Sequence, residues 1–211
     1  MKVTLFGATG KTGRYLISEG LKRGLELTVF ARTGSLFDDP NVRVIRGELT
    51  DKEALKDAIQ GADAVLSALG PAALKHPKTL PITRAMQSII AVMKQENVTR
   101  LIAISTGTAT DPDDGSDWKI RIPAWLIKIM MASAYQDIIA LAKTIRASEL
   151  DWTLVRVAFL NNHPTSSHLN VGLYGKTKHT MTLSREALAT FMFDQLLDDQ
   201  FINMAPGIST K

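Results

Sequence analysis

Three glycines spaced three residues apart, Gly7, Gly10 and Gly13, carry the most specific chemical pattern in this sequence. They follow an apolar run at residues 2–6 and precede a segment with helical periodicity, so the turn directs backbone N–H groups and the positive end of a helix toward one point. Gly7 permits the tight turn, Gly10 lacks the Cβ that would keep phosphates away, and Gly13 lets the helix pack closely on the strand. The pattern indicates a pyrophosphate site, and the alternative is a glycine cluster that binds no ligand.

The rest of the turn, Thr9 and the pair Lys11-Thr12, belongs to the same expected phosphate contact. Gly10-Lys11-Thr12 also has the form that ends a P-loop. That motif needs a glycine five positions before Gly10, where this chain has Leu5 inside the predicted strand. The spacing therefore argues against a nucleoside triphosphatase.

The second predicted strand, residues 26–31, determines which dinucleotide the site suits. An acidic side chain at the end of this strand is typical of NAD binding, whereas an arginine accommodates the additional phosphate of NADP. Here the strand ends at Arg32, and no carboxylate follows before Asp38. The sequence therefore predicts NADP(H), and the alternative is that Arg32 is a solvated surface side chain.

Apolar runs and helical periodicity alternate along the rest of the chain, which predicts strands alternating with helices. Thr50 and Glu53 have the spacing of a capping box at the start of one helix. We expect an α/β fold class, with residues 1–211 forming a single-domain, Rossmann-like, doubly wound parallel sheet. The predicted strands are residues 2–6, 26–31, 42–46, 62–69, 101–104 and 152–157, with residues 201–205 as a final edge strand.

Motifs along nearly the whole chain resemble the atypical short-chain dehydrogenase/reductase superfamily, in particular its NmrA-like and biliverdin/flavin-reductase-like branch. The resemblance implies NAD(P) binding and the Rossmann-like fold, and it specifies the substrate only weakly. The motifs are Gly7-Ala-Thr-Gly-Lys-Thr-Gly13, Val29-Phe-Ala-Arg32, Gly47-Glu-Leu-Thr-Asp51, Asp63-Ala-Val-Leu-Ser-Ala-Leu-Gly70, Ile104-Ser-Thr106, Ser148-Glu-Leu-Asp-Trp-Thr-Leu-Val-Arg156 and Ser184-Arg-Glu-Ala-Leu-Ala189.

The resemblance also implies that the segments following the strands line the cofactor. It assigns the remaining contacts by segment: Glu48 and Leu49 to the adenine; Ala68, Leu69 and Gly70 to the ribose and diphosphate; Ser105 and Thr106 to the nicotinamide; and Val157, Ala158 and Phe159 to the cover over the nicotinamide.

Reductases of this superfamily use a serine after the fifth strand and a Tyr-x-x-x-Lys pair on the next long helix, and Ser105 and Tyr135 are the corresponding catalytic candidates. The lysine of that pair lowers the pKa of the tyrosine phenol. Here the fourth residue after Tyr135 is Ile139, and the nearest lysine, Lys143, lies two turns along. Tyr135 is therefore expected to donate a hydrogen bond rather than act as a tuned base. The alternative is that it is a half-buried packing residue.

Composition excludes several other kinds of chemistry. The chain has no cysteine, so disulfides, zinc–thiolate sites and thiol nucleophiles are absent, and we expect a cytoplasmic protein. The 25 basic and 21 acidic residues are scattered, which predicts no nucleic-acid surface, and no apolar run is long enough to predict a membrane span. His163 and His168 lack a third ligand, so no metal site is predicted.

We therefore expect an oxidoreductase that passes hydride between NADP(H) and a small carbonyl, quinone or flavin-like acceptor. The expected substrate or lid segments are residues 110–131, which include an apolar helical stretch, and the polar residues 161–180. The alternative is a non-catalytic NADP(H) sensor acting through a protein partner. The sequence leaves open whether the protein is a monomer or a homodimer.

Overall fold

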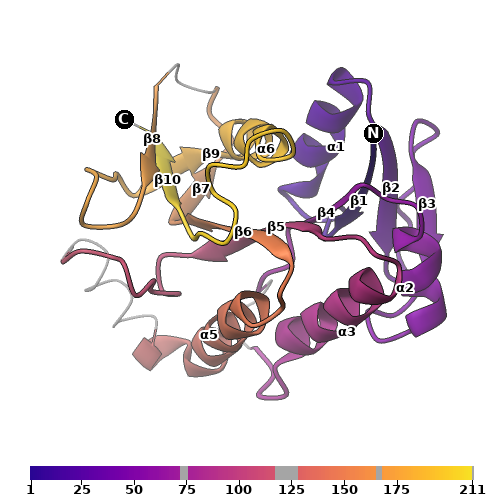
Figure 1. Ribbon diagram of the computed structural model, residues 1–211, viewed down its shortest axis with the longest axis horizontal. Coiled ribbons are helices and arrows are strands. Elements are labelled where there is room, and N and C mark those ends of the chain that lie inside the picture. The colour runs from indigo at the N-terminus through magenta and orange to yellow at the C-terminus, as the bar shows by residue number, and fades with distance from the viewer. Residues whose placement is uncertain (72–75, 117–127, 165–167, 211) are drawn as a thin grey trace.

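The computed structural model describes residues 1–71, 76–116, 128–164 and 168–210, and in them strands and helices alternate along the chain (Figure 1). The elements are β1 (Lys2–Phe6), α1 (Gly13–Lys22), β2 (Glu26–Ala31), β3 (Arg43–Arg46), α2 (Lys52–Ile59), β4 (Ala64–Ser67), α3 (Pro81–Gln95), β5 (Arg100–Thr106), α5 (Ala132–Arg146), β6 (Asp151–Val157), β7 (Phe159–Asn161), β8 (Leu169–Gly172), β9 (Thr182–Ser184), α6 (Arg185–Asp194) and β10 (Gly207–Thr210).

The main sheet has the order β3-β2-β1-β4-β5-β6-β10-β8, and β7 and β9 pair separately as a short parallel ribbon. All neighbours in the main sheet are parallel except β8, which runs antiparallel to β10 at one edge. From β1 the chain adds β2 and β3 toward one edge of the sheet, and from β4 it adds β5 and β6 toward the other edge. The carboxyl ends of β1 and β4 therefore form the switch point. Ligands of open α/β sheets bind at such a point.

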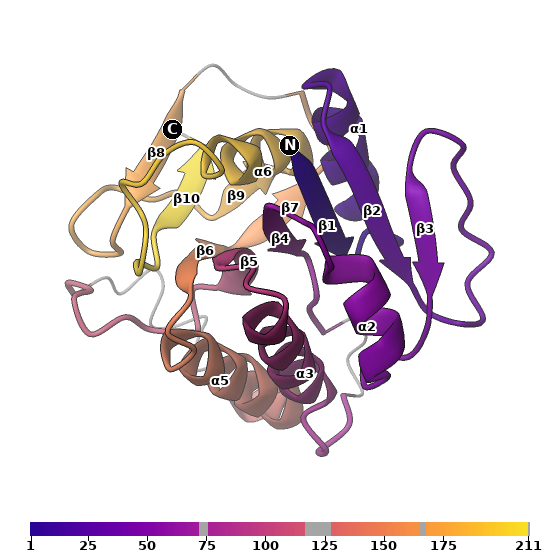
Figure 2. The ribbon, with the colours of Figure 1, turned by 45° about the vertical axis from the view of Figure 1, so that its right-hand side comes forward.

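Helices cover both faces of the sheet, as Figures 1 and 2 show: α1 and α6 lie on one face, and α2, α3 and α5 lie on the other. The strands between them are buried on both sides. In β4, for example, Val65 packs with the α2, α3 and α5 layer and Leu66 with the α1 and α6 layer. These layers confirm the predicted single-domain, doubly wound α/β fold.

Three local predictions were wrong. Residues 201–205 do not form the edge strand, because the backbone there turns through Asn203, whose φ is +57°; the strand is β10 instead. The true edge strand is β8, within the segment predicted as a polar loop. The residue that caps α2 is Asp51 rather than Thr50, because its carboxylate accepts hydrogen bonds from the N–H groups of Glu53 and Ala54.

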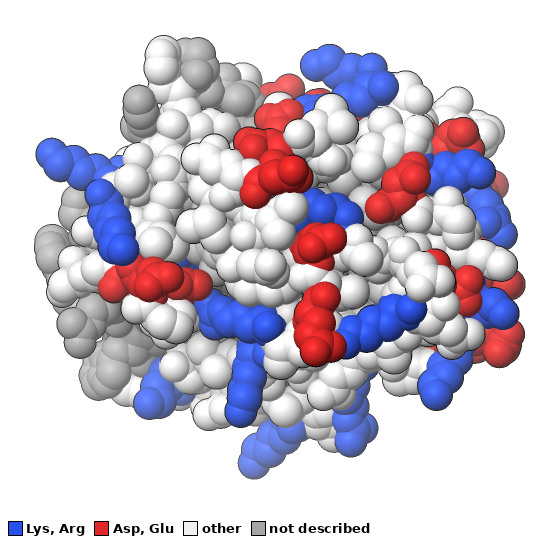
Figure 3. Space-filling model, in the orientation of Figure 1, with Lys and Arg blue, Asp and Glu red and all other residues white. Residues whose placement is uncertain are grey.

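Charged side chains are interspersed over the molecular surface in the view of Figure 3, with Lys and Arg close to Asp and Glu. In the described part of the chain, no helix is both long enough and apolar enough to span a membrane.

Candidate functional site

The glycine turn follows β1 at the switch point, and its geometry agrees with the role predicted for two of the glycines. Gly7 has a φ of +74°, and a Cβ there would lie 2.8 Å from the backbone carbon of Ala68. A Cβ on Gly13 would lie 1.8 Å from the carbonyl oxygen of Ala8. Gly7 is therefore required by the turn and Gly13 by the close approach of α1 to the chain that follows β1.

Gly10 differs from the other two because the protein crowds it less. The nearest atom to a Cβ at this position would be the Gly7 oxygen at 3.3 Å, the same oxygen that accepts the Gly10 N–H bond. The absence of a side chain at Gly10 thus leaves open space on the surface of the turn. This is the cradle that a phosphate group needs.

The N-terminus of α1 points at the same open space and has no cap of its own. Thr12, at the N-cap position, makes no side-chain capping bond, and the first turn contains no acidic residue. The backbone N–H groups of Lys11 and Thr12 donate to no residue that the structure describes. Free N–H groups at a helix N-terminus favour an anion.

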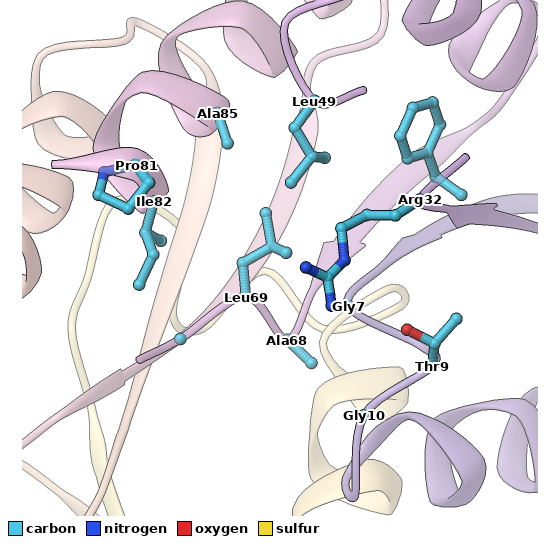
Figure 4. Close-up of a pocket in the computed structure, with 12 residues that line it drawn as sticks. Gly7, Thr9, Gly10, Arg32, Leu49, Ala68, Leu69, Pro81, Ile82 and Ala85 are labelled. Carbon is cyan, nitrogen blue, oxygen red and sulfur yellow. The ribbon is translucent and has the colours of Figure 1, made fainter. Parts of the chain in front are cut away.

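On one side of the turn lies a cavity of about 270 Å³, the Arg32 cavity, shown in Figure 4. Arg32 extends from the end of β2 with its guanidinium group directed into this cavity. The guanidinium group forms no hydrogen bond or ion pair with any described residue. The lining residues are Gly7, Thr9, Gly10, Phe30, Arg32, Leu49, Ala68, Leu69, Gly70, Pro81, Ile82 and Ala85.

On the other side lies a cavity of about 560 Å³, the Ser105 cavity. It shares five residues with the Arg32 cavity, so the two meet at the glycine turn. The Ser105 hydroxyl is buried and has no hydrogen-bond partner among the described residues. The lining residues are Gly7, Gly10, Lys11, Thr12, Ala68, Leu69, Gly70, Pro71, Ile104, Ser105, Thr106, Ile138, Leu141, Val157, Ala158 and Leu160.

Most of the residues predicted to contact a cofactor line one of these cavities. Three do not: Gly13 packs α1 on the turn, Glu48 is exposed, and Phe159 is exposed while the next residue, Leu160, lines the Ser105 cavity. The predicted residues that do line a cavity are Gly7, Thr9, Gly10, Lys11, Thr12, Arg32, Leu49, Ala68, Leu69, Gly70, Ser105, Thr106, Val157 and Ala158.

Of the two predicted catalytic residues, one lines a cavity and the other does not. Ser105 lines the cavity, whereas Tyr135 is half-buried near the start of α5 and lines neither cavity. The residues of α5 that face the Ser105 cavity are Ile138 and Leu141, so this wall is apolar. A catalytic role for Tyr135 stays a prediction.

Sequence reasoning missed the walls contributed by α3 and α5. Ile82 and Ala85 on α3 are spaced like Ile138 and Leu141 on α5, three residues apart on one helical face. This spacing identifies inward-facing apolar residues, but it is the same for residues that fill the core and residues that line a cavity. No signal in the sequence distinguishes the two.

The predicted lid segments fall outside both cavities or outside the described residues. Residues 117–127, most of the apolar helical stretch, lie outside the part of the chain that the structure describes. None of the described residues within 161–180 lines either cavity, and β8 lies four strands from β4 in the sheet.

The residues present fit a dinucleotide. An anion cradle at Gly10 and the N-terminus of α1 stands between two cavities, as a pyrophosphate stands between two nucleosides. In the Ser105 cavity, the buried hydroxyl without a protein partner is available to a polar group of the ligand.

A model of the family described as NAD(P)H-binding matches residues 7–199, from the glycine turn to beyond α6. The chain belongs to this family. YwnB from Bacillus subtilis is 24% identical over 158 residues, which cover 75% of this chain and 72% of YwnB. The isoflavone reductase homolog P3 from Arabidopsis thaliana is 24% identical over 195 residues, covering 86% of this chain but only 56% of that protein.

Solved structures share the fold of this NAD(P)H-binding protein over almost its full length. A short-chain dehydrogenase/reductase from Veillonella parvula in complex with NADP has a TM-score of 0.77 and 22% identity, with 99% of this chain and 94% of that chain covered. The oxidoreductase ylbE from Lactococcus lactis has a TM-score of 0.79 and 14% identity, with 100% and 91% covered. These structures confirm the predicted resemblance to short-chain dehydrogenases/reductases in fold.

Proposed function

We propose that this protein is an NADP(H)-dependent oxidoreductase that reduces a small-molecule acceptor in the Ser105 cavity. The observation that carries the proposal is this cavity of about 560 Å³, which adjoins the glycine turn and has mostly apolar walls. A concave, largely apolar site with a few polar groups is typical of small-molecule binding. A closed wall at this position would leave no space for an acceptor.

Arg32 supports NADP(H) as the cofactor. Its guanidinium group is directed into the Arg32 cavity and has no carboxylate partner among the described residues, so it is available to a phosphate. A charge-assisted hydrogen bond of this kind contributes about 1.5–3 kcal/mol, or roughly 10- to 100-fold in affinity. The solved structure of the Veillonella protein contains NADP, which agrees with this choice.

Calorimetric titration with NADPH and NADH tests the cofactor. We expect the wild type to prefer NADPH, Arg32→Ala to lose that preference, and Arg43→Ala to keep it. Arg43 is a matched control because it is also exposed but begins β3, near the amino end of β2, whereas Arg32 follows the carboxyl end of β2. Equal affinities for the two cofactors in the wild type would contradict the assignment.

The walls of the Ser105 cavity favour a quinone or flavin-like acceptor over a simple carbonyl. When bound, the dihydronicotinamide supplies the hydride. Reduction of a ketone or aldehyde produces a strongly basic alkoxide that needs a proton from an acid held nearby. Among the described residues lining the cavity, Lys11 is the one ionisable side chain, and it belongs to the phosphate turn. A quinone or flavin forms a much weaker base, which water protonates.

The chain's own contribution is to bind, orient and exclude water. Gly10, Lys11 and Thr12 hold the phosphates, and Ile138 and Leu141 form an apolar wall of the reaction space. The Ser105 hydroxyl orients a carbonyl or ring nitrogen by donating a hydrogen bond, since it has no described protein partner. This arrangement requires no tuned base.

A panel of quinones, flavins, aldehydes and ketones tests the reaction, read as loss of the near-ultraviolet absorbance of bound NADPH. We expect turnover with at least one quinone or flavin and little with the ketones. If NADPH binds but no compound oxidises it, and its binding instead controls the capture of a protein partner from cell extract, the sensor function replaces the enzyme.

A further inference from the structure

The carboxylate of Asp137 on α5 is fully buried, and donors from two other segments of the chain surround it. Its oxygens accept hydrogen bonds from the Thr83 hydroxyl at 2.6 Å and from the backbone N–H groups of Thr83 and Ile82 at 2.9 and 3.0 Å. The Nε2 atom of His76 lies 2.7 Å from the same carboxylate. No residue of the glycine turn takes part in this cluster.

The bonds from Ile82 and Thr83 make Asp137 the cap of a helix to which it does not belong. The N-cap residue of α3, Leu80, makes no capping bond and has a φ of +53°, in the left-handed region. Asp137 therefore satisfies the N–H groups that Leu80 leaves without a partner. Because Ile82 lines the Arg32 cavity, the same bonds fix one wall of that cavity.

His76 belongs to the connection from β4 to α3, the segment that leaves the sheet at the glycine turn. Gly70 and Pro71, at the start of this connection, line the Ser105 cavity. The His76 side chain is only 6% exposed, and its contact with Asp137 fixes the far end of the connection. The residue after Asp137, Ile138, lines the same cavity.

One carboxylate thus joins α3 and α5, which line cavities on the two sides of the turn, to His76. Burial raises the pKa of Asp137, but the hydrogen bonds from Thr83, His76 and Ile82 outweigh burial and hold it below its ordinary value. The carboxylate is therefore ionised at neutral pH.

We propose that Asp137 and His76 form a clasp that positions the walls of the cofactor cleft and thereby determines how tightly the dinucleotide binds. Both are positioning residues, since neither lines a cavity. The proposal rests on the proposed NADPH site. It adds to that site a pair of residues, His76 and Asp137, that are 61 residues apart in the sequence. The clasp acts before binding, by keeping the cleft in its binding geometry.

Substitution of His76 tests the clasp and leaves the buried carboxylate of Asp137 in place. We expect His76→Ala to weaken NADPH binding roughly five- to tenfold, measured by calorimetry at a temperature where the variant is folded, because loss of one hydrogen bond to the buried carboxylate also lowers the thermal midpoint. His76→Gln retains an amide N–H where Nε2 lies, so it should restore most of the affinity. Rescue by glutamine distinguishes positioning from a general loss of packing.

Asp51→Asn is the matched control, because Asp51 caps α2, a helix whose N-terminus lines neither cavity. It should leave NADPH affinity unchanged. The proposal is overturned if His76→Ala binds NADPH as tightly as the wild type, or if His76→Gln is as weak as His76→Ala. If the wild type itself does not bind NADPH, it is the proposed function that fails.

Discussion

The Arg32 cavity and the Ser105 cavity meet at one glycine turn, yet they are built in different ways. The Arg32 cavity takes its charged group, Arg32, from within one short strand–helix–strand unit, and that group is exposed and has no described partner. The Ser105 cavity combines residues from Gly7 to Leu160, most of them apolar. The proposed recognition of the anion is thus local in the sequence, whereas the proposed reaction space requires the whole sheet.

Away from the glycine turn, buried ionic groups connect segments that are distant in sequence. Asp137 holds α3 to α5, and Arg156, a fully buried residue of β6, contacts Asp114 through both terminal nitrogens at 2.5 and 2.7 Å. Arg156 also lies over the Tyr174 ring, with 4.7 Å from its Cζ atom to the ring centroid. We therefore expect substitutions at the Arg156–Asp114 pair and at the glycine turn to have separable effects.

The largest expected effect is on stability, from Asp114→Asn. It leaves the Arg156 charge buried without a counter-ion, which costs about 3–5 kcal/mol. Urea denaturation should show this loss, whereas Asp113→Asn, at an exposed neighbour, should change stability by less than about 0.5 kcal/mol. NADPH affinity of the folded fraction should stay within about threefold of the wild type. A larger loss of NADPH affinity in the folded protein would show that the Arg156–Asp114 pair also affects the cofactor site.

The next effect is on binding, from Gly10→Ala. The methyl group would lie 3.3 Å from the Gly7 oxygen, a tight contact that a small shift of the turn relieves, and it would occupy the proposed phosphate cradle. We expect NADPH affinity to fall about 100-fold, equivalent to about 2.8 kcal/mol, with little change in the thermal midpoint. Gly13→Ala is the contrasting variant, since its methyl group collides with Ala8 and should destabilise the fold. Gly10→Ala binding NADPH normally would contradict the position of the phosphates.

A smaller effect is expected on turnover. Tyr135 lines neither cavity, so Tyr135→Phe should lower kcat by about tenfold or less, below the 10²–10⁴-fold typical of general acid–base catalysis. Steady-state kinetics with the best acceptor from the panel measures this. A thousandfold loss with NADPH binding intact would show that the phenol reaches the reacting atoms.

The smallest effect is the dependence of stability on acid. The pKa values of Asp114 and Asp137 are held below the ordinary value of 3.8 because hydrogen bonds, from Arg156 and from Thr83 respectively, outweigh the effect of burial. Their contribution to stability is therefore complete above that value and decreases as the pH falls through the lower folded-state pKa values. Denaturation curves should show no loss from these two groups between pH 7 and pH 5, and a progressive loss below about pH 4. Loss of their contribution near pH 6 would contradict the direction of both shifts.

The sequence predicted the glycine turn and the place of Arg32 well because their determinants are neighbours along the chain. The glycine spacing specifies the turn, and Arg32 follows directly from the end of β2. It predicted β10 and β8 poorly. Strand β10 contains Gly207, where a Cβ would lie 2.8 Å from the Tyr174 ring, so its position depends on a residue 33 places earlier in the chain. No local pattern contains that information.

The sequence by itself determined the doubly wound order of elements, the glycine turn and the arginine beside it, because backbone sterics and hydrophobic periodicity act over a few residues. Only the tertiary structure decided that Ile138, rather than Tyr135, faces the Ser105 cavity, and that Asp137 caps a helix 54 residues earlier in the chain. Periodicity shows that a side chain points inward. Whether it meets the core, a cavity or an N–H group of another helix depends on which segments pack together.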